Sequence, residues 1–233
     1  MNGVLIAFLV LVIIFSIYMV VQYFNPSYVI RKATPLKIAN GKQYNIDVSE
    51  LDNPGSNRYF YEGWFYIDSN ESISTENVLF NRGKNFVVTL KGSTLNLYVN
   101  VTGSGVSEIS GVLDNSSKTP PLLSLSSFPF QKWCHLVINV DGLSVDLYID
   151  GKFVKNAKSQ SAISTNTTDP ITYGNQYTVG RVTRFRRMTT SINPQGVWNN
   201  YMLGSGENTS ISDYHINAQL IKNQNVRVDQ RII

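Results

Sequence analysis

The segment Lys132–Lys155 constrains the fold most strongly, because its apolar residues recur at every second position. A period of two is that of a β-strand, whose successive side chains point to opposite faces. The apolar face carries Cys134, Leu136, Ile138, Val140, Leu143, Val145, Leu147 and Ile149. The opposite face carries Trp133, His135, Asn139, Ser144, Asp146 and Asp150. We therefore expect antiparallel strands with one face on a core and the other toward solvent.

Two Asp-Gly pairs, Asp141-Gly142 and Asp150-Gly151, punctuate this segment. Glycine accepts the positive φ that tight hairpins require. The segment is therefore predicted as strand, turn, strand, turn and short strand.

This pattern resembles the concanavalin A-like lectin domains of the laminin-G and pentraxin type. The resemblance is carried by Lys132-Trp133, the apolar strand, Asp141-Gly142 and the run DLYIDGK at 146–152. Phe60 and Trp64 resemble an early strand of the same family. The resemblance implies an antiparallel jelly-roll sandwich. The alternative is an unrelated antiparallel β protein with two Asp-Gly hairpins.

Further alternating or aromatic runs predict the remaining strands of this sandwich. They are Arg58–Asp68, Asn77–Phe80, Phe86–Leu90, Leu95–Val101, Tyr177–Thr189 and Ile211–Ile221. The stretch Ser104–Leu125 is interrupted by glycine and proline and predicts loops with one or two short strands.

One short helix is predicted near the C-terminus, with Asn193 as its N-cap and Pro194 as its first residue. Its pattern resembles lectin-like domains in structural proteins of large nucleocytoplasmic DNA viruses, such as the chloroviruses. The residues that carry this resemblance are Pro194, Val197, Trp198, Tyr201 and Gly204. It implies a minor capsid protein.

The N-terminus carries 19 residues without charge, Gly3–Val21. As a helix this run would span roughly 28 Å, which matches the hydrocarbon core of a bilayer. A cleaved signal peptide is the alternative, although no Lys or Arg precedes the run and no small-x-small site follows it. The predicted anchor residues are Val4, Leu5, Ile6, Phe8, Leu9, Leu11, Ile13, Ile14, Phe15, Ile17, Met19, Val20 and Val21.

Four parts follow from this reading: an anchor at 1–25, a connector at 26–42, a concanavalin A-like β-sandwich at 43–222 and a polar tail at 223–233. With the anchor set aside, roughly 200 residues remain, which is enough for one sizeable core. We therefore expect a single sandwich domain rather than two.

Positive charge follows the predicted anchor but does not precede it, as Arg31, Lys32 and Lys37 show. Cytosolic flanks of membrane spans are enriched in Lys and Arg, so the body is expected on the cytosolic or capsid side of the membrane. In a virus this would be the internal membrane of the virion. On this topology the N-x-S/T asparagines carry no N-glycans; they are Asn70, Asn100, Asn115, Asn166 and Asn208.

A basic cluster on the last long strand, Arg184, Arg186 and Arg187, is a candidate docking patch for an acidic partner or lipid headgroups. Alternation places Arg184 and Arg186 on one face. The alternative is a solvated basic face without a partner.

Composition and motifs limit which ligands, cofactors and reactions we expect for this chain. Charged residues make up 15% of the chain and the formal charge is +4, so a nucleic-acid partner is not expected. The lone Cys134 is read as a small core residue, and two distant histidines do not suggest a zinc site. No cofactor is expected, and calcium is allowed by the family resemblance alone. Paired carboxylates spaced E-x-D-x-x-E do not occur, so the chain is not expected to be an enzyme.

Together these features predict a non-enzymatic, membrane-anchored binding or structural module. Its most specific form is a viral minor capsid protein that tethers the shell to the internal membrane, with membrane lipid and other capsid proteins as partners. The alternative is a membrane-anchored cell-surface lectin that binds carbohydrate. The two differ in topology, because a surface lectin must display its body outside the cell.

We expect the N-terminal helix to remain in the membrane, because moving 19 apolar residues into water is strongly unfavourable. Alkaline carbonate extraction should leave the full chain in the membrane pellet. A chain without residues 1–24 is the control and should move to the supernatant. Release of the full chain, or a mature N-terminus near Pro26, would contradict the anchor.

Overall fold

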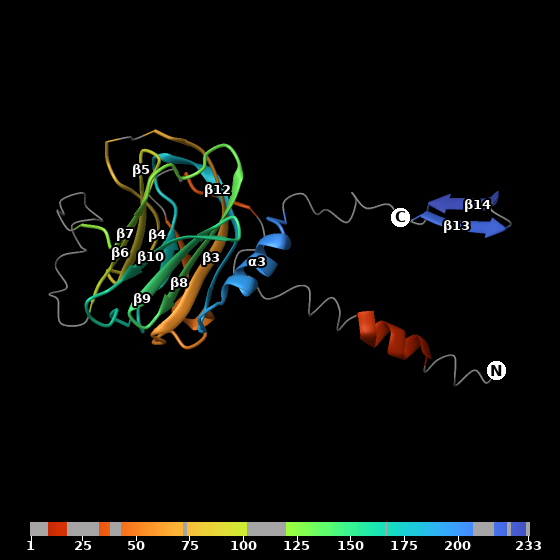
Figure 1. Ribbon diagram of the computed structural model, residues 1–233, viewed down its shortest axis with the longest axis horizontal. Helices are drawn as coiled ribbons and strands as arrows, with labels where there is room; N and C mark the ends of the chain where they lie inside the picture. The colour runs from red at the N-terminus through yellow and green to blue at the C-terminus, as the bar shows by residue number, and fades with distance from the viewer. Residues whose placement is uncertain are drawn as a thin grey trace.

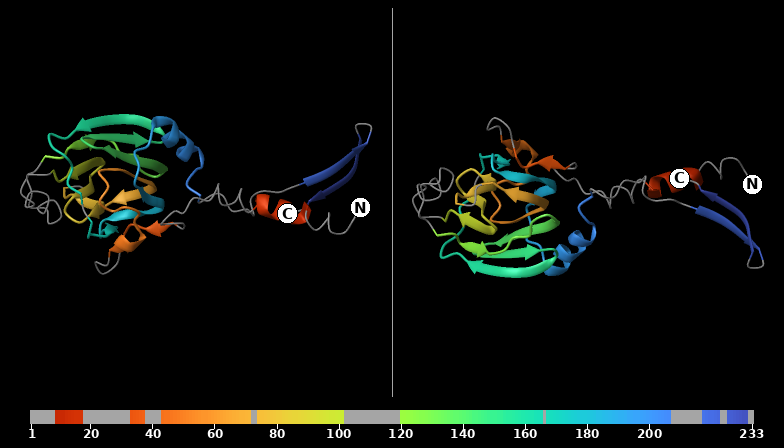
Figure 2. Two further views of the ribbon diagram at one scale, coloured as in Figure 1. Left: turned by 90° about the horizontal axis from the view of Figure 1, so that it is seen from below. Right: turned by 90° about the horizontal axis from the view of Figure 1, so that it is seen from above.

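The structure is a computed structural model that describes residues 9–17, 33–37, 43–71, 74–101, 120–165 and 167–206, and the backbone alone of 217–222 and 225–231. Its body consists of two six-stranded antiparallel sheets packed face to face (Figures 1 and 2). This two-sheet jelly roll, followed by a short helix, confirms the predicted all-β sandwich.

The first sheet has the strand order β1-β12-β3-β8-β9-β10 and the second has the order β2-β11-β4-β5-β6-β7. The strands of the first sheet are β1 (Thr34–Pro35), β3 (Arg58–Asn70), β8 (Trp133–Asp141), β9 (Ser144–Ile149), β10 (Lys152–Lys158) and β12 (Thr178–Met188). Those of the second are β2 (Tyr44–Ile46), β4 (Asn77–Arg82), β5 (Phe86–Lys91), β6 (Thr94–Val99), β7 (Leu123–Leu125) and β11 (Ile171–Tyr173). A 3₁₀ turn, η2 (Val48–Glu50), follows β2, and the helix α3 (Pro194–Met202) follows β12.

The core lies between the two sheets and is built largely from alternating residues of their strands. The alternation predicted in β8 and β9 is confirmed, because Cys134, Leu136, Ile138, Val140, Val145 and Leu147 are all buried in this core. Aromatic side chains from both sheets fill its centre, among them Tyr61, Phe65, Phe80, Phe86 and Phe185. Burial raises the pKa of the Cys134 thiol, as expected for a core residue rather than a reactive one.

Both predicted hairpins form, but the first differs in detail. Asp141 pairs with Ser144, so the central residues of that turn are Gly142 and Leu143. Leu143 was placed on the core face by alternation; instead it lies in the turn and is 36% exposed. The second turn is Asp150-Gly151, as predicted, and both of its residues have positive φ.

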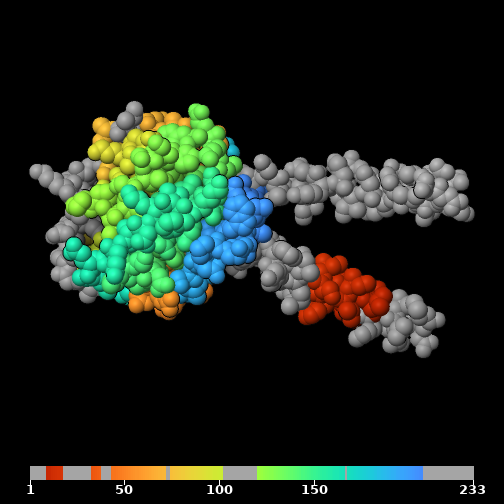
Figure 3. Space-filling model, in the orientation of Figure 1, coloured from red at the N-terminus to blue at the C-terminus, as the bar shows by residue number. Residues whose placement is uncertain are grey.

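The outer face of the first sheet departs from the expected solvent-facing pattern. His135 and Asn139 lie on this face, yet both are buried. His135 is covered by α3, whose Tyr201 ring lies 6.0 Å from the His135 ring, and Asn139 by the segment before the helix, where it accepts from the Ile192 amide. The helix itself lies beside β10 (Figure 3). A small second core forms beneath α3 from Phe60, Val137, Tyr148 and Val197, with Ile192 packed against it.

The N-terminal cap of α3 is the one predicted from the sequence. The Asn193 side chain accepts a hydrogen bond from the Gly196 amide at 2.7 Å, and Pro194 occupies the first turn. Gly204 has a φ of +69 just beyond the helix, where the chain turns away.

An irregularity in β12 corrects the predicted arginine patch. The pairing register of β12 with β3 shifts between Thr183 and Arg186, and Arg184 has a φ of +52. Side chains therefore do not alternate strictly between the two faces at this point. Arg186 and Arg187 are each only 7% exposed. The premise of three exposed docking charges is therefore wrong, and only Arg184 remains half-exposed.

The ends of the domain also differ from the predicted boundaries. Within the expected connector, Thr34–Pro35 pairs with β12 and Leu36 is fully buried in the core. The expected tail contains β14 (Asn225–Arg231), which pairs with β13 (Asn217–Lys222) in a separate two-stranded sheet.

The predicted anchor is described only in part. Residues 9–17 are helical and their apolar side chains are exposed. The remainder of the run Gly3–Val21 lies outside the described residues, as do Arg31 and Lys32. Within the described part of the chain, no helix is both long enough and apolar enough to cross a bilayer.

Candidate functional site

A buried carboxylate, Glu62 of β3, organises the outer face of the first sheet. Its neighbours on either side in the sheet are Val137 of β8 and Arg186 of β12. Arg186 donates from Nε and Nη2 to Glu62 Oε2 at 3.0 and 2.8 Å. The Nε2 atom of His135 lies 2.9 Å from Glu62 Oε1. Because a carboxylate only accepts, this contact requires the proton of His135 on Nε2.

The same carboxylate binds α3 to the sheet. Asn200 donates from Nδ2 to Glu62 Oε2 at 3.0 Å. The next residue of the helix, Tyr201, stacks its ring on that of Trp64, with ring centroids 5.6 Å apart and ring planes 17° from parallel. The helix is therefore held by a charge-assisted hydrogen bond and by aromatic packing, not by its apolar face alone.

The electrostatics favour an ionised Glu62. Burial is the largest single influence and would raise its pKa, but the hydrogen bonds and charges of His135 and Arg186 together outweigh it. The net effect lowers the pKa of Glu62 below its ordinary value of 4.5. A buried anion with cationic and neutral donors on every side is thus stable as an anion.

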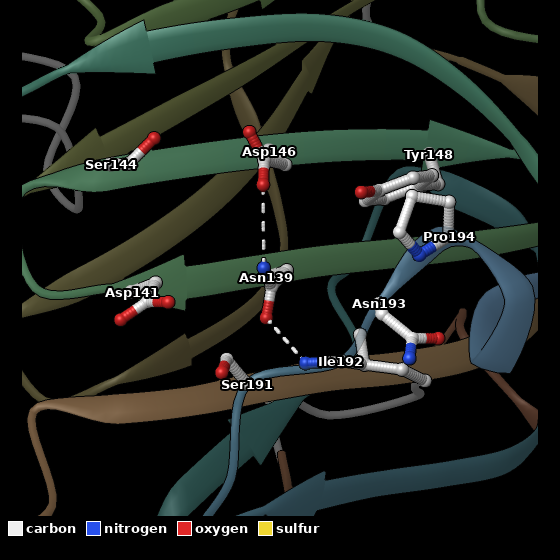
Figure 4. A pocket seen from close by; sticks show the side chains of 9 residues that line it. All are labelled: Asn139, Asp141, Ser144, Asp146, Tyr148, Ser191, Ile192, Asn193 and Pro194. Carbon is white, nitrogen blue, oxygen red and sulfur yellow. Dashed lines mark hydrogen bonds between the residues drawn. The ribbon is translucent and has the colours of Figure 1, made fainter.

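A polar groove lies where the segment before α3 crosses β8 and β9 (Figure 4). Its volume is about 660 Å³, and it opens to solvent. It is lined by Asn139, Asp141, Ser144, Asp146, Tyr148, Ser191, Ile192, Asn193 and Pro194. One wall is thus the outer face of the sheet, and the other is the chain that leads into the helix.

Asn139 connects the two walls of this groove. Its Nδ2 donates to Asp146 Oδ2 at 3.3 Å, and its Oδ1 accepts from the Ile192 amide at 2.9 Å (Figure 4). A second amide, Asn156 of β10, donates to Asp146 Oδ1 at 2.6 Å. Asp146 is therefore oriented by an amide on each side.

At the α3 end of the groove the ring of Tyr148 stands beside Pro194, with its hydroxyl directed into the groove (Figure 4). Burial, and then the charge of Asp146, raise the pKa of Tyr148, so the phenol remains protonated and can donate. At the opposite end Asp141 forms an ion pair with Arg58, whose Nε lies 2.7 Å from Asp141 Oδ1.

This arrangement suits the recognition of a neutral, hydroxyl-rich molecule. The groove offers carboxylate and amide oxygens as acceptors, a phenol and amides as donors, and the faces of Tyr148 and Pro194 as apolar surface. Among the described residues, no group of three or more His, Cys, Asp or Glu side chains is placed to hold a metal ion. Calcium, which the family resemblance allowed, gains no site in that part of the chain.

Local sequence patterns did not predict this site. Asp146 and Asn139 were assigned to the outer face, but nothing in their spacing showed that the segment 191–194 would form a second wall. Glu62 was overlooked, although a single carboxylate in the aromatic run RYFYEGWFYID is a signal, because a buried charge requires partners.

The predicted residues outside this groove have other roles. Arg187 stacks its guanidinium 4.6 Å from the Tyr59 ring centroid. Lys37 forms an exposed ion pair with Glu71. Of the five N-x-S/T asparagines, Asn100 is buried and Asn70 is half-buried and accepts from Asn77, while the other three lie outside the described residues.

We predict that Glu62→Gln destabilises the domain by about 3–5 kcal/mol, because Arg186 would keep its buried charge without an anion. The matched control is Glu71→Gln, which breaks an exposed ion pair and should cost at most about 1 kcal/mol. Guanidinium unfolding of the two variants measures the difference. Equal losses would show that the Glu62 cluster is not a stabilising centre.

The stability of the same variant should also depend on pH differently from that of the wild type. Because the pKa of Glu62 is lowered by folding, its contribution is fully present above its ordinary value of 4.5 and is lost as pH falls through the lower value of the folded state. As pH falls from 4.5 through that lower value, the wild-type domain should therefore lose stability more steeply than Glu62→Gln does.

Comparison with solved structures identifies the fold independently. The binding domain of botulinum neurotoxin serotype D is 13% identical, with a TM-score of 0.54 over 72% of this chain and 42% of that chain. The binding domain of botulinum neurotoxin DC in complex with rat synaptotagmin II is 11% identical, with a TM-score of 0.53 over 74% of this chain and 45% of that chain. The same domain in complex with SialylT has a TM-score of 0.51 at 11% identity, over 74% and 45%. At these identities the likeness concerns the fold alone, and this chain spans less than half the length of those chains.

Comparison with curated proteins gives no match. A family match, in contrast, covers residues 40–197, which is more than half of the chain. These residues include both sheets of the sandwich apart from β1, and the start of α3. The chain belongs to the Concanavalin A-like lectin/glucanases superfamily.

Proposed function

We propose that the sandwich is a binding module that recognises carbohydrate, or a similarly hydroxylated ligand, through the groove on β8 and β9. The observation that carries this proposal is the fixed trio of Asp146, Asn139 and Tyr148 on the sheet wall of the groove. Sugar hydroxyls need donors and acceptors at fixed positions, and the apolar face of a sugar ring packs on an aromatic side chain.

The solved relatives are consistent with a binding role. Among them are a complex with a protein, rat synaptotagmin II, and a complex with SialylT. Those ligands are properties of the neurotoxin domains, and we carry over to this chain only the class of activity, which is recognition rather than catalysis.

A catalytic role is less well supported by the contacts in the groove. Two carboxylates are present, as a glycosidase would need. However, Asp141 is held by Arg58, and Asp146 is held by two side-chain amides. Both carboxylates therefore serve most simply as acceptors held in a fixed orientation, and each keeps lone pairs that can accept from a ligand hydroxyl.

We also propose that the module is tethered to a membrane by its N-terminus. Residues 9–17 form a helix whose apolar side chains, such as Leu11 and Phe15, face outward. An apolar helical surface of this kind requires a non-aqueous environment. The body on the cytosolic side remains a prediction from Arg31, Lys32 and Lys37.

The minor capsid role is a more specific proposal within this one. It depends on the resemblance carried by α3 and on the proposed tether, with other capsid proteins as partners. The cell-surface lectin is the alternative use of the same anchored module. Copurification of the chain with virions would favour the first, and protection of the body in sealed microsomes would favour the second.

The groove is tested by binding to a glycan array, with the full chain in detergent micelles. We expect at least one class of glycan to bind. Tyr148→Phe and Asp146→Asn should each weaken that binding about tenfold, which corresponds to one hydrogen bond of about 1.4 kcal/mol. Both changes preserve side-chain shape, so the fold should persist.

The matched controls are Tyr177→Phe and Asp68→Asn, which make the same chemical changes at exposed positions outside the groove. They should bind as the wild type does. Absence of binding to every glycan, or equal loss in the controls, would refute the groove as a carbohydrate site.

A further inference from the structure

An apolar surface lies on α3 and the neighbouring strand β10. It consists of Phe153, Trp198, Met202 and Leu203, which are 56, 40, 64 and 39% exposed. We call these four residues the α3 patch. They belong together because α3 contacts β10, and because Phe153 packs edge-on against Tyr148, which shares the small core beneath α3.

The α3 patch is rigidly supported from below. Trp198 lies on the Asp150-Gly151 turn, so closely that a Cβ on Gly151 would be 2.9 Å from Trp198 Cε3. Tyr201, on the same helix, stacks on Trp64. The exposed apolar side chains are thus presented by a fixed element, and their exposure is not the result of a loosely packed helix.

Charge around the patch is mainly positive. The helix itself, PQGVWNNYM, carries no charged residue. Lys152 follows the turn on which Trp198 lies, and Arg184 donates from Nη1 to the Leu203 carbonyl at 3.1 Å. A nearby carboxylate, Asp150, is paired with Lys132 at 3.1 Å, and Glu62 beneath the helix is paired with Arg186. Apolar residues that include tryptophan, within a cationic rim, match the interfacial zone of an anionic bilayer.

The position of the patch relative to the N-terminus selects the bilayer as its occupant. Thr34 of β1 pairs with Val182 of β12, two residues from Arg184, which contacts the end of α3. The chain therefore enters the sandwich close to the C-terminal end of α3.

The connecting chain is short. Residues 22–32 separate the predicted span from the first described residue of the sandwich, and even fully extended they reach only about 40 Å. A surface held so close to a membrane meets it at high effective concentration, so a modest apolar contact is sufficient for docking.

We infer that the α3 patch docks onto the surface of an anionic lipid bilayer, with Trp198, Met202, Leu203 and Phe153 at the level of the headgroups. The docked sandwich has a fixed orientation, because anchor and patch are two separate attachments. The groove adjoins the patch where Tyr148 packs against Phe153, and it extends from there toward Asp141 and Ser144 at the other end of β8 and β9. This inference uses the proposed anchor but is independent of what the groove binds.

The test is quenching of tryptophan fluorescence by lipids that carry bromine on their acyl chains near the headgroup. The full chain is placed in nanodiscs of phosphatidylcholine and phosphatidylserine, with or without the brominated lipid. All three tryptophans lie in the sandwich, so emission reports on the body and not on the anchor. We expect the brominated lipid to quench the wild type, and Trp198→Phe to lose most of that quenching.

Two further variants separate docking from a change in fold. Met202→Asp places a charge in the patch and should abolish quenching while Trp198 is still present. Leu143→Asp makes the same kind of change at an exposed leucine in the turn at the other end of β8 and β9, and should leave quenching intact. Far-ultraviolet circular dichroism verifies that each variant is folded.

Quenching of the wild type that is lost in both patch variants and kept in Leu143→Asp supports docking on the bilayer. An unquenched wild type, or equal quenching in Trp198→Phe, overturns the inference. Self-association of the wild type that Met202→Asp abolishes, without any quenching, would assign the patch to a second copy of this chain and also overturns it.

Discussion

One buried anion, Glu62, joins α3 to the outer face of the first sheet. It accepts hydrogen bonds from β8, β12 and α3 through His135, Arg186 and Asn200. Without that carboxylate α3 would lose its hydrogen bond to the sheet and keep its aromatic and apolar contacts, such as that of Tyr201 with Trp64. The sandwich core could still form, because its inward-facing residues do not involve Glu62. The cluster therefore contributes both to the stability of the domain and to the position of α3 on its outer face.

The position of α3 has two consequences at its two ends. At its N-terminal end the segment 191–194 becomes a wall of the polar groove, fixed by the hydrogen bond from the Ile192 amide to Asn139. At its C-terminal end Trp198, Met202 and Leu203 form an apolar surface close to where the chain enters from the N-terminus. A single helix thus separates a surface suited to hydroxylated ligands from one suited to lipid. A fold shared by many binding domains does not specify either use, which comes from the residues placed upon it.

The sequence predicted those parts of the fold that depend on local patterns. Alternation in β8 and β9, the Asp150-Gly151 turn and the Asn193 cap are each encoded within a few residues, so each could be found without the structure. Leu143 was misplaced because a two-residue turn interrupts the alternation. Arg186 and Arg187 were misplaced because a bulge in β12 changes which way successive side chains point.

The candidate site could not be predicted in the same way, because it depends on contacts between distant segments. Glu62 and Asn200 are 138 positions apart, and Asn139 and Ile192 are 53 apart. Asn139 and Asn200 resemble ordinary surface residues until the segment 191–202 is placed over the sheet. The lone Glu62 in an aromatic strand was the one local clue.

Hydrogen–deuterium exchange of Asn200→Ala tests most directly whether the Glu62 cluster holds α3 in place. This change removes the bond from the helix to Glu62 and leaves the pairs of Glu62 with Arg186 and His135 intact. The account predicts faster exchange of the amides of residues 197–202 than in the wild type, with unchanged protection in β3 and β8. Unchanged exchange in α3, or a wild-type helix that already exchanges as fast as an open loop, would contradict it.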